Sequence, residues 1–502
     1  MTEAHRPLEP PDPPDPGDPF ATALAQHLTY PHRRGHIPED AFSGAAGGGA
    51  CGDLVRISLA CTDAEHVTDA GFDASGCGAT LAAASAAVSL ARGRTLLDAA
   101  RLGPDDLVAE LGGLSPAKRH AAELAADALH RALGAAARAR ARLAPVSARV
   151  LVAMSGGVDS AVAALLTTRT GAEPVAVTLE LWADPANDGE RSCCSAQAVR
   201  QARALAHDLG LPHLTLDLRA EFRAGVVDPW LVDHAAGLTP NPCVRCNGEV
   251  RLDGMLELAD RIGARALATG HYARLDHSGP APLLRGAVDP AKDQSYMLAA
   301  LAPASLARLS FPLGELLKPR VRELAAEAGL PVAGRPDSQD LCFLAGTGRA
   351  AFLARHGGLH ERPGAIVDRQ GLVLGRHRGH HAYTVGQRRG LGLGGRDPLY
   401  VLAIDAGANT VTVGAVEELE TDTVRLRNVT LHRPAALADG VRLRYRARPL
   451  TARLIPRGAS PGEHRELRLA LDDDAPVTGG AAPGQLACLL AGDVIVGHGT
   501  IA

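Results

Sequence analysis

The pattern of apolar and polar positions changes along the chain, which predicts parts of different architecture. Between residues 148 and 330, short apolar runs that predict strands alternate with amphipathic stretches that predict helices. An alternation of this kind favours a parallel, doubly wound sheet. The predicted strands are residues 148–153, 173–182, 213–218 and 266–273.

The patterns before and after this region are different. The first part predicts a small α+β unit, and short strands from about residue 419 onward predict a small β-barrel. Between the α/β region and the barrel, from about residue 360, glycines interrupt the apolar runs. In the α+β unit we expect strands at 54–62 and 67–75 and helices at 79–93 and 115–143. The expected parts are a leader (1–19), an α+β domain (20–142), a linker (143–148), an α/β domain (149–355), a central domain (356–418) and a barrel (419–502).

The composition is that of a globular protein, and it narrows the classes of partner. The chain has 502 residues, which is too many for one hydrophobic core. Hydrophobic residues make up 46% of the chain and charged residues 22%. A net charge of −4 excludes a uniformly basic nucleic-acid coat, and 3% aromatic residues argue against a protein that stacks many bases. No apolar run is long enough for a membrane span, and the N-terminus is acidic and proline-rich, unlike a signal peptide. We therefore expect a cytoplasmic protein with no membrane partner and with its nine cysteines reduced.

A glycine loop with the sequence SGGVDS follows the first strand of the α/β region. Glycine lets the backbone approach an anion closely, and the N–H groups at the start of the next helix attract it. The loop resembles the pyrophosphate loop of adenylating enzymes, which implies that it binds ATP and that Asp159 orients Mg²⁺. Asparagine, GMP and NAD synthetases and tRNA sulfur transferases all remain open on this loop alone. Its residues are Ser155, Gly156, Gly157, Val158, Asp159 and Ser160.

Three cysteines form a second constellation. Cys243 and Cys246 lie in TPNPCVRCN, and Cys342 lies in DSQDLCF about a hundred residues later. A Cys-x-x-Cys pair alone is ambiguous between structural zinc, a redox dithiol and an iron–sulfur ligand pair. Three thiolates suit either a persulfide and nucleophile pair or a [4Fe–4S] cluster with one open iron.

Residues 148–502 resemble the tRNA-specific 2-thiouridylase family. The glycine loop and the cysteine motifs occur in the order seen in that family, together with ATGHYAR, KDQSYML, FPLGELLKPRVRELA and YTVGQRRGLGLGG. The resemblance implies an ATP-dependent sulfurtransferase that adenylates the 2-oxygen of the wobble uridine (position 34) and replaces it by sulfur. The products would be 2-thiouridine, AMP and pyrophosphate. The implied partners are tRNAs with Lys, Glu and Gln anticodons and a cysteine desulfurase or sulfur-relay donor.

The resemblance also assigns roles to single residues. Cys246 matches the family's nucleophile and Cys342 its persulfide carrier, while Leu179 and Gly270 match further ATP contacts. Many members carry Asp where this chain has Cys243, so a cluster held by Cys243, Cys246 and Cys342 stays open as the alternative mechanism. The positions that match contacts to tRNA or its target base are Asn241, Pro242, Cys243, His271, Lys292, Asp293, Gln294, Arg444, Tyr445 and Gln485.

Arginines are concentrated in the predicted barrel. Nine of them, against the single acid Asp439, lie between residues 423 and 460. In RLRYRAR (442–448) alternation along a strand would place four arginines on one face, a row suited to phosphates. The alternative is an ordinary solvated barrel face.

The N-terminal region carries a third constellation. Residues 28–135 resemble the iron–sulfur assembly scaffold family of the IscU and NifU N-terminal type, through PHRRGHIP, ACGDLVRISL, SGCGATLAAASAAVSLARGRTL and SPAKRHAAELAADAL. Where that family has a third cysteine, this chain has Ala121, so the site is either a cluster or zinc site or a vestigial docking surface. A tRNA-binding carrier without catalysis is therefore the alternative function. The candidate ligands are Cys51, Asp53, Cys77 and His120.

Overall fold

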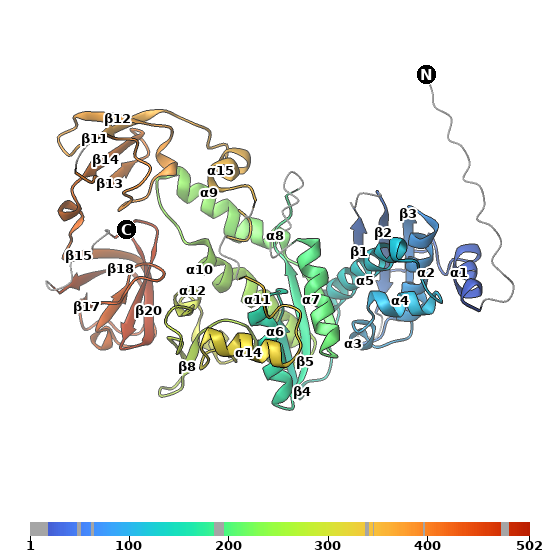
Figure 1. Ribbon diagram of the computed structural model, residues 1–502. Coiled ribbons are helices and arrows are strands. Elements are labelled where there is room, and N and C mark those ends of the chain that lie inside the picture. Colours follow the sequence, from blue (N-terminus) through green and yellow to red (C-terminus); the bar gives the residue numbers. More distant parts are fainter. Residues whose placement is uncertain are drawn as a thin grey trace, which may run out of the picture. The chain divides into compact units, whose positions relative to one another are not determined.

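The computed structural model describes residues 19–47, 52–61, 65–184, 195–336, 341–344, 346–394, 397–472 and 481–502 (Figure 1). Two compact units make up the chain: an N-terminal unit of Met1–Ala144 with Ala206–Leu216, and a C-terminal unit of Pro145–Leu205 with Asp217–Ala502. The finer domain boundaries expected from the sequence stay a prediction. Among the described residues, no helix combines the length and the apolar character that a membrane span needs.

The N-terminal unit is the α+β unit that its pattern predicted, and its antiparallel sheet has a third strand beyond the two expected. The strands lie in the order β1 (Phe42–Gly47), β2 (Leu54–Ala60) and β3 (Asp69–Ser75). The sequence FSGAAG of β1 did not predict a strand because it has almost no β-branched or aromatic residues. The helices are α1 (Pro19–Thr29), α2 (Gly78–Ala91), α3 (Leu96–Ala99), α4 (Pro104–Glu110) and α5 (Arg119–Ala139), with a 3-10 turn at Pro116–Lys118.

Small residues let the longest helix lie directly on this sheet. α5 packs against β1 and β2, and its buried face consists mostly of alanine and leucine. A Cβ added at Gly44 in β1 would clash with the backbone carbonyl of Ala128 in α5. The small side chains of α5 and the glycine in β1 therefore allow the helix to pack closely on the strand, and the start of α5 lies beside the sheet.

The alternating pattern predicted a parallel sheet, and four of its five strands, β4, β5, β7 and β10, belong to the C-terminal unit. The strand order of the sheet is β10-β7-β4-β5-β6, and β4 pairs in parallel with both β5 and β7. β4 starts inside the expected linker and leads into the glycine loop. The strands are β4 (Val146–Ala153), β5 (Glu173–Glu180), β6 (His213–Asp217), β7 (Ala264–Ala268) and β10 (Leu309–Ser310).

Helices surround this sheet and carry the cysteine motif. α6 packs against β4, β5 and β7, α11 packs against β4 and β7, and α14 packs against α6. One π-helical segment, Asn247–Arg251, follows α10 directly, and another, Arg223–Val227, precedes α9. The helices are α6 (Val158–Arg169), α7 (Ala196–Asp208), α8 (Arg219–Phe222), α9 (Asp228–Ala235), α10 (Pro242–Cys246), α11 (Leu252–Arg261), α12 (Ser295–Leu298), α13 (Pro303–Leu306), α14 (Lys318–Glu327) and α15 (Arg349–Gly357).

Two β structures complete this unit. A four-stranded sheet, β12-β11-β14-β13, forms the central part, and the last six strands close into the predicted barrel through pairing of β15 with β20. The strands β9 and β8 extend the barrel sheet beyond β20. The bounds are β8 (Arg274–Asp276), β9 (Leu283–Arg285), β11 (Gly364–Val367), β12 (Val373–His377), β13 (Tyr400–Asp405), β14 (Thr410–Gly414), β15 (Thr423–Leu431), β16 (Gly440–Arg442), β17 (Leu450–Ile455), β18 (Gly462–Leu471), β19 (Leu486–Ala491) and β20 (Val494–Ile501).

The prediction that residues 442–448 form a strand with four arginines on one face is wrong. β16 ends at Arg442, and the chain then turns, with the Ala447 N–H donating to the Arg444 carbonyl at 3.2 Å and Arg446 at a φ of +63°. Arg442 donates to the Asp293 carboxylate at 2.8 Å and Arg444 donates to the Val385 carbonyl at 2.8 Å, so protein contacts hold both side chains. Only Arg446 and Arg448 of the four are exposed.

Candidate functional site

The glycine loop has the geometry of an anion site. Gly156 has a φ of +74°, which favours glycine, and α6 begins directly after Gly157 without a side-chain cap. The Ser155 N–H donates to the Ser160 hydroxyl at 3.1 Å, and that hydroxyl donates to the Gly157 carbonyl at 3.1 Å. These bonds fix the turn and leave the helix N-terminus, with its positive dipole end, directed to the loop.

Two neighbouring strands approach this loop at their carboxyl ends. A Cβ at Gly270, just after β7, would lie 2.8 Å from the Ser160 nitrogen and 2.9 Å from the Asp159 carbonyl carbon, so the position needs glycine. Leu179 lies near the end of β5, and its side chain is half-buried. Leu179 and Gly270, which the family resemblance matches to ATP contacts, therefore lie at the edge of the sheet where ligands bind in folds of this kind.

Asp159 is held by two side chains from elsewhere in the unit. The Lys318 ammonium donates to both carboxylate oxygens, at 2.7 and 2.8 Å, and the Tyr272 hydroxyl donates to Oδ1 at 2.8 Å. Lys318 was not predicted as a site residue, although it lies in one of the family motifs. The composition offered one signal that could have singled it out: lysine is rare, with three among 52 basic residues.

The cysteine motif starts a helix that faces a cavity. The Asn241 side chain caps α10 by accepting from the Cys243 N–H at 3.1 Å, and Pro242 occupies the first turn. The Gln485 side chain donates to the Thr239 carbonyl, which fixes the approach to the helix. The cavity measures about 290 Å³, and its lining includes Trp230, Pro240, Asn241, Pro242, Val244, Arg245, Arg427 and His498.

The cysteines differ in exposure. Cys246 is buried, with 5% exposed, whereas Cys243 and Cys342 are half-buried. Cys342 is followed by Phe343, whose ring lies 5.3 Å from that of Trp230, which itself lines the cavity. Residues 337–340 of the same motif lie outside the described residues. Within the described parts of the chain, Cys243, Cys246 and Cys342 do not gather into a metal-binding group, and the cluster mechanism stays a prediction.

The residues matched to tRNA contacts make internal bonds that position their loops. Burial lowers the pKa of His271 to about 3, and its Nδ1 lies 2.9 Å from the Thr269 hydroxyl. The Gln294 side chain accepts from the Tyr272 N–H at 3.0 Å. Lys292 is half-buried beside Asp293, and Tyr445 stacks against the Arg446 guanidinium at 5.2 Å. Contact of these residues with tRNA stays a prediction.

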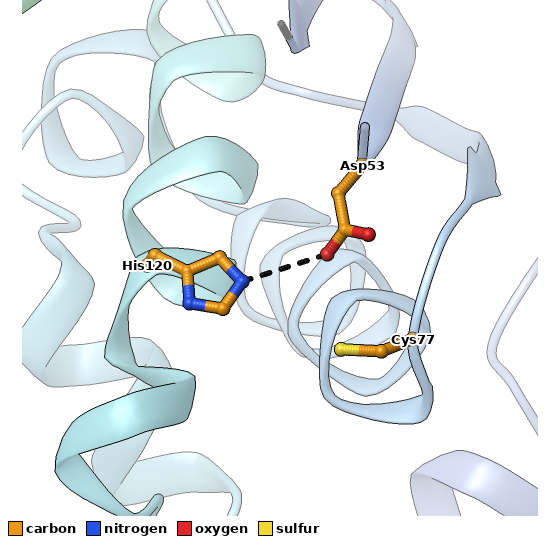
Figure 2. Close-up of side chains that lie close together, drawn as sticks. All are labelled: Asp53, Cys77 and His120. Atoms are coloured by element: carbon orange, nitrogen blue, oxygen red, sulfur yellow. Dashed lines mark ion pairs between the residues drawn. The ribbon is translucent and has the colours of Figure 1, made fainter. Parts of the chain in front are cut away.

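A second site lies in the N-terminal unit. Figure 2 shows Asp53, Cys77 and His120 directed toward one another, from the start of β2, the N-cap of α2 and the first turn of α5. One ligand atom of each lies within 4.8 Å of the others, and His120 Nε2 is 3.6 Å from Asp53 Oδ2. Ala121 is fully buried and supplies no ligand, and Cys51 lies outside the described residues.

The electrostatics of this group suit a cation. Burial raises the pKa of Asp53, but hydrogen bonds from the Thr80 hydroxyl and the Cys77 N–H outweigh it, so the pKa lies below its usual value. Burial likewise opposes ionisation of Cys77, but hydrogen bonds from Thr80 and the helix start hold the pKa of the thiol below its usual value. His120 Nε2 is buried, and among the described residues it has no hydrogen-bond partner. These donors fit a borderline metal such as zinc or iron.

Comparisons with known proteins cover nearly the whole chain. Three family models match: a NifU-like N terminal domain at residues 21–141, a tRNA methyl transferase HUP domain at 148–346, and a tRNA methyl transferase PRC-barrel domain at 350–415. The "Bifunctional protein NifU/MnmA" of Rubrobacter xylanophilus is 42% identical over 496 residues, which are 96% of this chain and 98% of that protein. The "tRNA-specific 2-thiouridylase MnmA" of Magnetococcus marinus is 45% identical over 316 residues, 61% of this chain and 88% of that protein.

Proposed function

We propose, from the premise that the chain belongs to the family of bifunctional NifU/MnmA proteins, that it is an ATP-dependent tRNA 2-thiouridylase. The observation that carries the proposal is that one unit holds both an anion-binding glycine loop and a cavity lined by the start of α10, the helix that carries Cys243 and Cys246. The loop would bind the phosphates of ATP, and the cavity would receive the wobble uridine beside Cys243.

The first step is adenylation of the uridine. Its 2-oxygen attacks the α-phosphorus of ATP, the bond from that phosphorus to the bridging oxygen breaks, and pyrophosphate leaves with the electron pair. The amides at the start of α6 bind the phosphates. The Asp159 carboxylate and the hydroxyls of Ser155 and Ser160 are oxygen donors of the type that Mg²⁺ prefers, and a bound Mg²⁺ would neutralise phosphate charge there.

The second step is sulfur transfer. The outer sulfur of a persulfide on Cys342 attacks C2 of the uridine, and AMP leaves with the former 2-oxygen. The Cys246 thiolate then attacks the Cys342 sulfur, which releases 2-thiouridine and leaves a disulfide between the two cysteines. A thiol reductant or the sulfur donor must return this disulfide to thiols before the next turnover. We propose a cysteine desulfurase or a relay protein as the donor, and tRNAs with Lys, Glu and Gln anticodons as substrates.

Incubation of the purified protein with tRNA, ATP, a cysteine desulfurase with its cysteine substrate, and a thiol reductant tests the function, because the desulfurase supplies sulfur as a persulfide. We expect 2-thiouridine, AMP and pyrophosphate in equal amounts. AMP formation with another acceptor would identify a different ATP pyrophosphatase. Binding of tRNA without AMP formation would identify a non-catalytic carrier instead.

The exposed arginines after β16 are expected to contact tRNA phosphates. Replacement of both Arg446 and Arg448 by alanine should lower the slope of log affinity against log salt by roughly 0.7–0.9 for each phosphate that the variant no longer neutralises. Binding assays over a range of salt concentrations measure this slope. Arg320→Ala is the matched control, because Arg320 is exposed on α14 and already paired with Glu323 and Glu327. If the double variant keeps the slope of the control, the turn is a solvated face only.

We also propose that Asp53, Cys77 and His120 hold one metal centre, either zinc or an iron–sulfur cluster. Asp53→Ala is expected to remove the metal, because it deletes the carboxylate at the centre of the group. Elemental analysis of anaerobically purified protein, with sulfide quantitation, measures the loss and separates zinc from a cluster. Asp73→Ala, in an exposed position on β3, is the control and should keep its metal. A wild-type protein without zinc or iron would identify a vestigial site.

A further inference from the structure

Lysine is almost excluded from this chain, yet one lysine is buried at the glycine loop. Of 52 basic residues, 49 are arginine, so arginine is the default cation of the sequence. Lys318 is the first residue of α14, and its side chain is only 10% exposed. Its position thus needs an explanation beyond a general requirement for positive charge.

The surroundings of Lys318 fix the ammonium at the start of the loop helix. The Lys318 N–H donates to the Asp289 carboxylate at 2.9 Å, which anchors the beginning of α14. The ammonium contacts both oxygens of Asp159 and lies 5.9 Å from the centre of the Tyr272 ring. Since Asp159 is in the first turn of α6, the positive charge is held where the phosphates of a nucleotide would bind.

A purely structural ion pair does not account for lysine here. A guanidinium binds a carboxylate through two parallel hydrogen bonds and is the usual choice for a buried pair. This chain makes that choice between Arg442 and Asp293, whose side chains are 19% and 9% exposed. An ammonium is instead a compact charge with three rotatable donors, which can leave one anion and bind another in a small space.

We propose that Lys318 binds the phosphates of ATP, and that its pairing with Asp159 is the resting arrangement that ATP displaces. The inference rests on the proposed function in that ATP is taken as a substrate. When ATP enters, the ammonium exchanges the carboxylate for oxygens of the β and γ phosphates. The exchange frees the Asp159 carboxylate for a cation and places a positive charge on the pyrophosphate that leaves.

Calorimetric titration with ATP and with AMP tests the proposal. Lys318→Ala should weaken ATP binding by about 10- to 100-fold, the usual effect of removing a charge-assisted hydrogen bond, and AMP binding by less than about 2-fold. Lys318→Arg should recover only part of the ATP affinity. Arg320→Ala, two residues further along α14, is the control and should bind ATP as the wild type does. Equal weakening of ATP and AMP, or no weakening of either, would make Lys318 a structural counter-ion and overturn the proposal.

A double-mutant cycle without Mg²⁺ gives a second, independent test. Asp159→Asn removes the competing carboxylate charge but leaves an oxygen that Tyr272 can donate to, so ATP should bind more tightly in the presence of EDTA. This gain should vanish when Lys318→Ala is added. A gain that persists in the double variant would contradict the exchange. If Lys318 proves necessary for ATP binding but the wild type forms no 2-thiouridine, the inference holds and the proposed function fails.

Discussion

Replacement of Asp159 by alanine is expected to reduce AMP and pyrophosphate formation by at least about 100- to 1,000-fold. The carboxylate is the oxygen donor at the start of α6, and its loss also leaves the buried Lys318 ammonium without this partner. Binding of tRNA should stay within about 2-fold of the wild type, because the expected RNA contacts are elsewhere in the unit. Release of labelled pyrophosphate measures the first quantity, and a filter-binding assay measures the second.

Two controls separate chemistry from folding in this experiment. Glu323→Ala changes an exposed carboxylate on α14 and should leave turnover unchanged. Asp159→Asn keeps the size of the side chain and should be as inactive as the alanine variant, with a melting temperature closer to that of the wild type. Turnover at the wild-type rate in either Asp159 variant would show that the glycine loop is not the adenylation site.

Replacement of Cys246 or of Cys342 by serine is expected to eliminate 2-thiouridine while adenylation, and with it release of pyrophosphate, still occurs for at least one turnover. Neither thiol takes part in attack on the α-phosphorus, so adenylation and sulfur transfer should separate. Mass spectrometry of digested tRNA measures the modified nucleoside, and release of labelled pyrophosphate measures adenylation. Cys488→Ser is the matched control, because Cys488 is buried in the barrel strand β19. Thiolation by either variant would remove that cysteine from the mechanism.

Cys243→Asp distinguishes the two mechanisms that remain. If Cys342 carries a persulfide and Cys246 resolves it, Cys243 is a half-buried neighbour, and most activity should remain. If the three thiolates hold a cluster, the substitution removes a soft ligand, and iron and activity should fall together. An active Cys243→Asp enzyme without iron would therefore exclude an obligatory three-cysteine cluster.

The sequence by itself determined the architecture wherever periodicity and local chemistry agreed. Alternation of apolar runs and amphipathic helices predicted the parallel sheet, and SGGVDS predicted the loop, because a turn before a helix needs glycine at Gly156 whatever surrounds it. The regular short strands predicted the closed barrel. The sequence signals for these features lie within a few residues of one another along the chain, although the strands that pair are far apart in sequence.

Only the tertiary structure decided the features that depend on distant partners. β1 is a strand because Gly44 lets α5 approach, although its own residues favour none. The arginines after β16 do not alternate along a strand, because Arg442 is held by Asp293, 149 residues away in the chain. Lys318 reaches the glycine loop, and Asp53, Cys77 and His120 meet, only after folding. A sequence pattern reports the preferences of neighbouring residues, whereas these pairings arise from packing between segments that no local period connects.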